Sequence, residues 1–191
     1  KLDGDYFDRS GNGYHLTKVG SPTFSYSVPT VIQKYVQFNG SNGLRNTTEF
    51  TNTFNSTNAT YAGWINYNSV SNDSIMRFFE TRNLDTHAHS GIGIQSGNDR
   101  FQIHGKGQST TTWSPSTNIW YHFAWTKSNN VNTFYVNGHN IGSETSVNNT
   151  ILTSDDRFSI GVSANDASTS FAHAKFADVS FYNEGLTEND V

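Results

Sequence analysis

Short runs of strand-forming residues, each bounded by Gly, Asn, Ser or Asp, recur along the whole chain and constrain its fold more than any other feature. The clearest runs cover residues 32–38, 62–67, 75–80, 91–95, 100–104, 120–126, 133–136, 158–162 and 175–182. A helical period does not extend beyond one turn, except near 186–191. Short strands separated by turn residues are typical of an antiparallel sandwich. We therefore predict an all-β, two-sheet antiparallel β-sandwich with about ten to fourteen strands.

One turn is specified by its own residues. Asn137 and Gly138 stand between the run 134–136 and the run 139–142. An Asn-Gly pair favours the type I′ turn, because both residues tolerate positive φ and the turn matches the right-handed twist of the strands. We predict a β-hairpin at this position.

The chain has the length and composition of one folded domain. Its 191 residues fit a single sandwich, and we find no linker or internal repeat, so we predict one domain over residues 1–191. The chain starts at Lys1 without an apolar leader, which suggests a piece excised from a larger protein. The absence of cysteine excludes a disulfide framework.

Charge and hydropathy exclude two classes of partner. The net charge is −4, with 12 basic against 16 acidic residues, and no basic stripe suggests a nucleic-acid binder. No apolar run approaches the roughly 20 residues that span a bilayer. A sparsely charged chain rich in Asn, Ser, Thr and Gly suits a protein that works outside the cell.

Six short motifs follow one another along the chain. They are Asp-Arg-Ser-Gly-Asn-Gly at 8–13, Tyr-Val-Gln-Phe-Asn-Gly at 35–40, Ala-Gly-Trp-Ile at 62–65, Trp-Tyr-His-Phe-Ala-Trp-Thr at 120–126, Tyr-Val-Asn-Gly at 135–138 and Phe-Ala-Asp-Val-Ser-Phe-Tyr-Asn at 176–183. Their order resembles the laminin-G-like jelly-roll family of the concanavalin A-like lectin and glucanase superfamily. Together they cover almost the whole chain. They specify the fold far more than the function.

The resemblance implies a candidate calcium site. The loop at 8–13 offers the Asp8 carboxylate and the Asn12 amide, and similar proteins often pair this loop with an Asp in the last strand, here Asp178. Calcium prefers such oxygen ligands. An Asx-turn without metal is the alternative, because Asp and Asn side chains also bond their own backbone. Any calcium bound here is expected to be structural.

Polar and aromatic residues in three predicted loops are candidates for sugar binding. Sugars are held by aromatic faces and by planar polar groups that bond hydroxyls. The candidates are Arg82, Asp85, His87, His89, Trp113, Asn165 and Asp166. Simple solvation of these loop residues is the alternative for each of them.

Strand residues receive a structural interpretation. Trp64, Trp120 and Trp125 lie within predicted strands, so we expect them to pack in the core or on a strand surface. His122 is expected to be a structural histidine. His87 and His89 lack a third zinc ligand nearby.

Two classes of enzyme are alternatives to a binding module. Glycoside hydrolysis needs paired carboxyl groups, but the strand acids Glu80 and Asp178 stand alone. An alginate-lyase type of polysaccharide lyase is a better rival, because Gln102-Ile103-His104 matches its Gln-Ile-His strand, with Arg77 or Arg82 as carboxylate neutraliser. Its catalytic tyrosine strand has no counterpart, and Tyr182 is a poor substitute.

These observations predict a non-catalytic, lectin-like module of a secreted protein, an adhesin, or a phage or viral surface protein. Its partner would be a polysaccharide or glycoconjugate, with other domains of the same surface protein beside it. The expected localisation is extracellular, at the cell surface or at the virion surface. A protein-interaction or spacer module is the alternative, because laminin-G-like domains also bind proteins.

Overall fold

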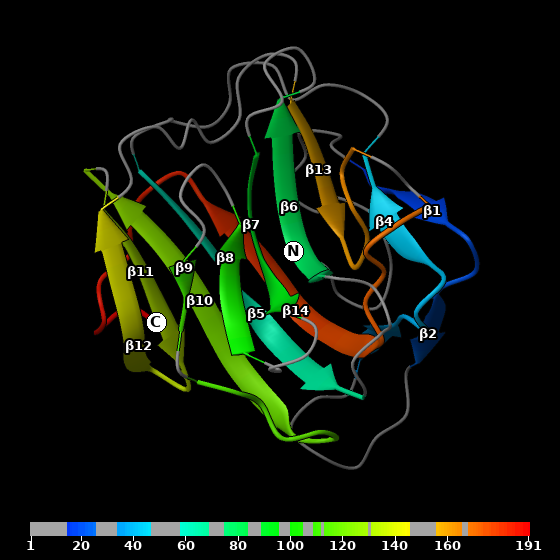
Figure 1. Ribbon diagram of the computed structural model, residues 1–191, viewed down its shortest axis with the longest axis horizontal. Helices are drawn as coiled ribbons and strands as arrows, with labels where there is room; N and C mark the ends of the chain where they lie inside the picture. The colour runs from blue at the N-terminus through cyan, green and yellow to red at the C-terminus, as the bar shows by residue number, and fades with distance from the viewer. Residues whose placement is uncertain are drawn as a thin grey trace.

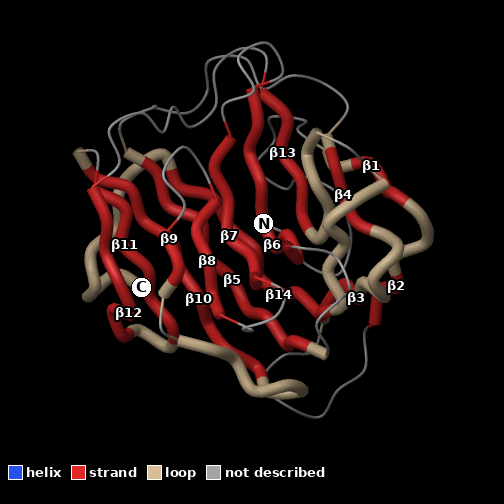
Figure 2. Tube along the Cα trace, in the orientation of Figure 1, coloured by secondary structure: helices blue, strands red, loops and turns tan. Residues whose placement is uncertain are grey.

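The computed structural model describes most of the chain. It covers residues 15–25, 34–46, 58–68, 75–83, 89–95, 100–104, 109–111, 113–129, 131–145, 156–165 and 168–191. These residues form strands and loops without a helix, as Figure 2 shows. No helix in these ranges is long and apolar enough to cross a bilayer. The all-β prediction is confirmed.

The described residues form 14 strands in two antiparallel sheets of seven. Sheet I has the order β1 (Thr17–Val19), β4 (Gly43–Arg45), β13 (Asp156–Ile160), β6 (Ile75–Asn83), β7 (His89–Gln95), β8 (Arg100–His104) and β9 (Ser109–Thr110). Sheet II has the order β12 (His139–Thr145), β11 (Val131–Val136), β10 (Trp120–Ser128), β5 (Ala59–Tyr67), β14 (Ala174–Tyr182), β3 (Tyr35–Gln37) and β2 (Thr23–Ser25). Figure 1 shows sheet I in front of sheet II. The two-sheet sandwich is confirmed.

Aromatic side chains from both sheets fill the space between them. Phe79 of sheet I lies 5.2 Å from the ring of Phe123 in sheet II, and its ring stacks on Phe158 at 6.2 Å. Trp125 stacks on Tyr61 at 4.9 Å. These side chains are at most 3% exposed. Each such ring removes a large apolar area from water, and this burial holds the two sheets together.

The predicted Asn-Gly turn joins β11 to β12. Asn137 and Gly138 have φ angles of 50° and 78°, the positive values that a type I′ turn requires. The backbone amide of Asn137 donates to the carbonyl of His122 at 2.7 Å, and Asn137 Oδ1 accepts from the amide of His122 at 2.9 Å. The hairpin prediction is confirmed, and the turn is tied to β10.

The segment that follows β13 is anchored at Gly161. Its φ is 74°, and a Cβ at this position would lie 2.3 Å from the ring of Phe38, so only glycine fits. The Gly161 amide donates to the Phe78 carbonyl at 3.0 Å, and its carbonyl accepts from Ala172 at 2.8 Å. Gly161 and Ala172 are thereby held beside β6.

Candidate functional site

Sheet I presents an unusual set of charged residues on its outer face, the face turned away from the core. Because Phe79 and Phe158 point into the core, the residues that alternate with them lie on the opposite face. The register places Glu80 opposite Ser159 and Gly91, and Arg82 opposite Arg157 and His89. We call the region around Arg77, Glu80, Arg82 and Arg157 the arginine face.

Glu80 is the anchor of this face. Its side chain is fully buried, at 0% exposure, although it stands on the outer side of the sheet. Its Oε2 accepts a hydrogen bond from the backbone amide of Ala164 at 2.7 Å, and its Oε1 lies 3.5 Å from Nη1 of Arg77. A buried carboxylate needs such partners, because desolvation penalises its charge. Glu80 thus ties the loop after β13 to β6.

Arg77 is the cation of this buried pair. Its side chain is 12% exposed. Burial lowers the pKa of Arg77, the Glu80 carboxylate opposes this by raising it, and the charge of Arg82 lowers it further. The Nε atom of Arg77 is buried and has no hydrogen-bond partner. A single carboxylate therefore leaves part of this guanidinium unsatisfied.

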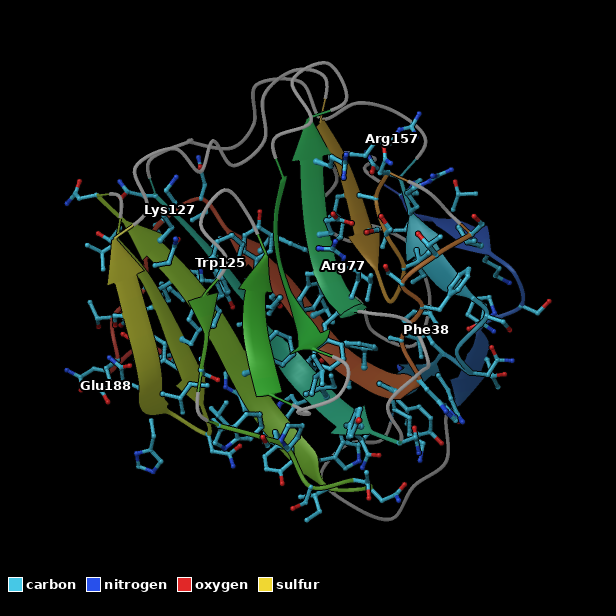
Figure 3. All side chains as sticks on the ribbon, viewed as in Figure 1. Phe38, Arg77, Trp125, Lys127, Arg157 and Glu188 are labelled. Atoms are coloured by element: carbon cyan, nitrogen blue, oxygen red, sulfur yellow. The ribbon has the colours of Figure 1, made fainter. Side chains whose placement is uncertain are left out.

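Arg82 and Arg157 stand directly opposite each other on β6 and β13. Both are half-buried, and neither has an ion-pair partner within the described part of the chain. The Nε atom of Arg82 is buried without a hydrogen-bond partner. Like charges directly opposite on neighbouring strands destabilise a sheet. The pair is therefore poised to receive an oxygen-rich or anionic group. Figure 3 shows Arg77 and Arg157, both on the sheet I side of the molecule.

Three of the predicted sugar-binding residues belong to this face or to the loop bonded to it. Arg82 is directly opposite His89 in the β6–β7 ladder, and the side chain of His89 lies outside the described part. Asn165 is exposed one residue beyond Ala164, which bonds Glu80. Its amide donates to Ser163 Oγ at 3.3 Å. The loop that carries Asn165 is thus fixed against β6.

The other predicted sugar-binding residues are placed elsewhere or not described. Trp113 lies in the segment between β9 and β10, where its ring meets the edge of Tyr121 at 5.1 Å and packs against the core cluster. β9 is the edge strand of sheet I and is separated from β6 by β7 and β8. Asp85, His87 and Asp166 lie outside the described residues.

The candidate calcium ligands are also only partly described. Asp8 and Asn12 lie outside the described ranges. Asp178 is exposed, has a φ of 49° and stands at a bulge of β14, where the register with β5 shifts between Ala177 and Ser180. Within the residues described, no group of three or more His, Asp and Glu side chains could hold a metal ion. Calcium at these three residues stays a prediction.

The residues of the lyase alternative are divided between the sheets. The register places Gln102 opposite Gly93, which faces Arg77, and places His104 opposite Gly91, which faces Glu80. The side chains of Gln102 and His104 lie outside the described part. Tyr182 belongs to β14 of sheet II, so it does not share the arginine face. The substitute tyrosine and the Gln-Ile-His strand do not converge.

The strand tryptophans take the places that the sequence predicts. Trp125 is in the core, at 1% exposure. Trp64 and Trp120 are half-buried on the outer surface of sheet II. Local sequence patterns do not predict Arg157 as part of a site. Glu80 and Arg82, two apart in a strand, signal a shared face, but only the β6–β13 register brings Arg157 to them.

A family model described as the concanavalin A-like lectin/glucanases superfamily matches residues 33–191. No protein with curated annotation matches the sequence significantly.

Solved structures share the fold at low identity. Domain 4 of AbnA, an extracellular arabinanase from Geobacillus stearothermophilus solved with arabinotriose, is 19% identical, with a TM-score of 0.74 over 97% of this chain and 90% of that one. Trypanosoma rangeli sialidase in complex with sialic acid is 18% identical, with a TM-score of 0.70 over 96% of this chain and 31% of that one. The binding domain of Paraclostridial Mosquitocidal Protein 1 is 16% identical, with a TM-score of 0.68 over 96% and 47% respectively. This chain spans less than half of the latter two.

Proposed function

Since the chain belongs to the concanavalin A-like lectin/glucanase superfamily, we propose that it is a non-catalytic carbohydrate-binding module whose ligand is held at the arginine face. The observation that carries this proposal is the cross-strand pair of Arg82 and Arg157, for which the described residues supply no ion-pair partner. Planar guanidinium groups bind carboxylates and other oxygen pairs in a bidentate manner. A glycan that bears a carboxylate or a sulfate would satisfy both groups.

The solved structures that share this fold are consistent with a carbohydrate-binding role. One of them was solved with an oligosaccharide, and another belongs to a protein solved with an acidic sugar. A fold does not determine a function, so the assignment depends on the site itself. On the arginine face the Nε atoms of Arg77 and Arg82 have no acceptor among the described residues, and Asn165 adds an exposed side chain next to Ala164.

We also propose that the module does not catalyse a reaction on its ligand. Glu80 is occupied by Ala164 and Arg77, so it is not a free general acid. The buried pair instead fixes the loop after β13 to β6. We further propose that the module acts outside the cell or on a cell or virion surface, and that calcium at Asp8, Asn12 and Asp178 has a structural role.

The test compares matched acidic and neutral sugars. Isothermal titration would measure sialyllactose against lactose, and a galacturonate trimer against a galactose trimer. At least one acidic member should bind more tightly than its neutral partner, and added salt should weaken that preference, because exposed charges are screened. Each titration is repeated with a chelator to test the calcium proposal. Loss of binding or of thermal stability would support calcium.

Two variants locate the site. The double variant Arg82→Gln/Arg157→Gln should lose the acidic preference, whereas Lys18→Gln, an exposed cation on β1 of the same sheet, should keep it. An acidic preference that survives in the double variant would move the ligand away from the arginine face. If a glycan array shows no ligand at all, a spacer or protein-binding module replaces the carbohydrate proposal.

A further inference from the structure

Among the described residues, the chain crosses one half of the outer face of sheet II, the covered half, and leaves the other half, here the uncovered half, without a covering segment. Residues after β14 cross one half: Thr60 Oγ1 donates to the Glu184 carbonyl at 2.8 Å and accepts from the Leu186 amide at 2.9 Å. Val191 packs against a small cluster of buried residues, which consists of Ala62, Ala124 and Tyr135. This half is closed by the chain's own end segment.

The uncovered half carries aromatic rings from three strands. Trp64 of β5 is directly opposite His122 of β10, and their rings are 5.4 Å apart. Trp120 of β10 lies 6.0 Å from Tyr35 of β3. All four side chains are half-buried, so each ring keeps part of its surface open to solvent. We call this set, together with the polar groups described next, the aromatic platform.

Two asparagine amides belong to the same surface. Asn66 alternates with Ile65 and Tyr67 of the core, so it shares the outer face with Trp64, and the register places it between Trp120 and Lys175. Asn66 is only 4% exposed, yet its Oδ1 has no hydrogen-bond partner. Asn68 follows at the next alternate position. Its Nδ2 donates to Asn118 Oδ1 at 3.0 Å, while its own Oδ1 is buried without a partner.

Charge is sparse on the platform. Lys175 places its Nζ atom 5.7 Å from the centre of the Tyr35 ring, an arrangement that occupies the cation with an aromatic face. Burial lowers the pKa of His122, so its imidazole is neutral at pH 7. The hydroxyl groups of a ligand could donate to these buried acceptors, which have no donor in the protein. Exposed aromatic rings with little charge around them favour a ligand that is neutral.

We propose that the aromatic platform is a second carbohydrate-binding surface, which takes the neutral sugar residues of a glycan chain. The apolar C–H face of a sugar ring would lie on Trp64 or Trp120. Asn66 Oδ1 and Asn68 Oδ1 are closed to solvent in the free chain, so the sugar's hydroxyl groups would donate to them after a local movement of the side chains around them. The surface shares no residue with the arginine face, because the two lie on the outer sides of different sheets. Each can therefore exist without the other.

The experiment uses neutral trisaccharides and two kinds of variant. Arabinotriose, cellotriose and maltotriose are titrated into the complete chain at millimolar concentration. At least one should bind, and Trp120→Ala should weaken that binding about tenfold or more, equivalent to about 1.4 kcal/mol. Asn66→Leu keeps the aromatic rings and removes the acceptor, so it should also weaken binding. Tyr182→Ala removes an exposed aromatic elsewhere on β14 and should change nothing.

The outcomes separate this site from the arginine face. Arg82→Gln/Arg157→Gln should bind the neutral trisaccharide normally, and Trp120→Ala should bind the acidic probe normally. The second site is refuted if none of the three trisaccharides binds the wild-type chain, or if both platform variants bind as the wild type does. It is also refuted if sedimentation shows a wild-type dimer that Trp64→Ala and Trp120→Ala convert to monomer, because a second copy would then cover the rings.

Discussion

The two outer faces of the sandwich handle buried polar groups in opposite ways. On sheet I, the charge of Glu80 is neutralised within the protein by Arg77 and an amide, under a loop held down at Gly161. On sheet II, the acceptor of Asn66 is left without a donor, under half-open aromatic rings. The contacts of Glu80 hold the loop after β13 on sheet I, and the cations Arg82 and Arg157 lie beside them. Sheet II leaves an unsatisfied acceptor buried beneath the surface that carries the aromatic rings.

The two faces should differ most in how the free energy of unfolding changes when one buried polar group is removed. Glu80→Gln removes the carboxylate and leaves the Arg77 guanidinium buried without a counter-charge, so the free energy of unfolding should fall by about 3 kcal/mol. Urea denaturation measures this loss, with exposed Glu188→Gln as the control. An unchanged midpoint would mean that the pair does not anchor the loop.

On sheet II, removing a buried polar group should raise the free energy of unfolding and not lower it. In Asn66→Leu, a buried amide without a partner for its oxygen is replaced by an apolar side chain of similar size, so the free energy of unfolding should rise by about 1 kcal/mol. The same variant should bind neutral trisaccharide more weakly. Thermal and urea denaturation measure the stability change. A loss of stability would show that Asn66 serves the fold.

A smaller effect concerns pH. Because burial lowers the pKa of His122 in the folded state, the unfolded chain binds the proton more readily, and stability should fall as the pH drops below about 6.5. His122→Gln should remove this contribution and flatten the pH dependence. The comparison is made by urea denaturation at pH 7 and at pH 5. Identical slopes in both proteins would contradict the assignment.

The smallest expected effect belongs to the arginine pair itself. Arg82→Gln removes the charge repulsion between Arg82 and Arg157, which lie opposite each other. The free energy of unfolding should therefore stay unchanged or rise by about 0.3 kcal/mol. Differential scanning calorimetry would resolve this, with Lys18→Gln as the reference. A clear loss of stability would mean that Arg82 is a structural residue.

The sequence predicts the fold well, because alternation and turn chemistry are local properties. Asn137 and Gly138 specify their hairpin directly, and the alternation of Trp64, Asn66 and Asn68 could have indicated a shared surface. What escapes prediction is the pairing of distant strands. Arg157 meets Arg82 only through the register of β13 with β6, and Tyr35 meets Trp120 only because β14 and β5 bring β3 near β10. Such contacts depend on the topology of the whole sandwich.

The distribution of the four tryptophans has a spectroscopic consequence. Trp125 is enclosed by Tyr61 and Phe134, Trp113 is packed at an edge, and Trp64 and Trp120 share the platform. Emission from the enclosed indole should be blue-shifted and protected from acrylamide, whereas the platform indoles should emit further to the red and be quenched. The tryptophan fluorescence of the unmodified chain therefore reports where a sugar binds. A sugar bound to the outer face of sheet II would protect the red-shifted emission of Trp64 and Trp120 from acrylamide. A sugar bound to sheet I would leave the emission unchanged.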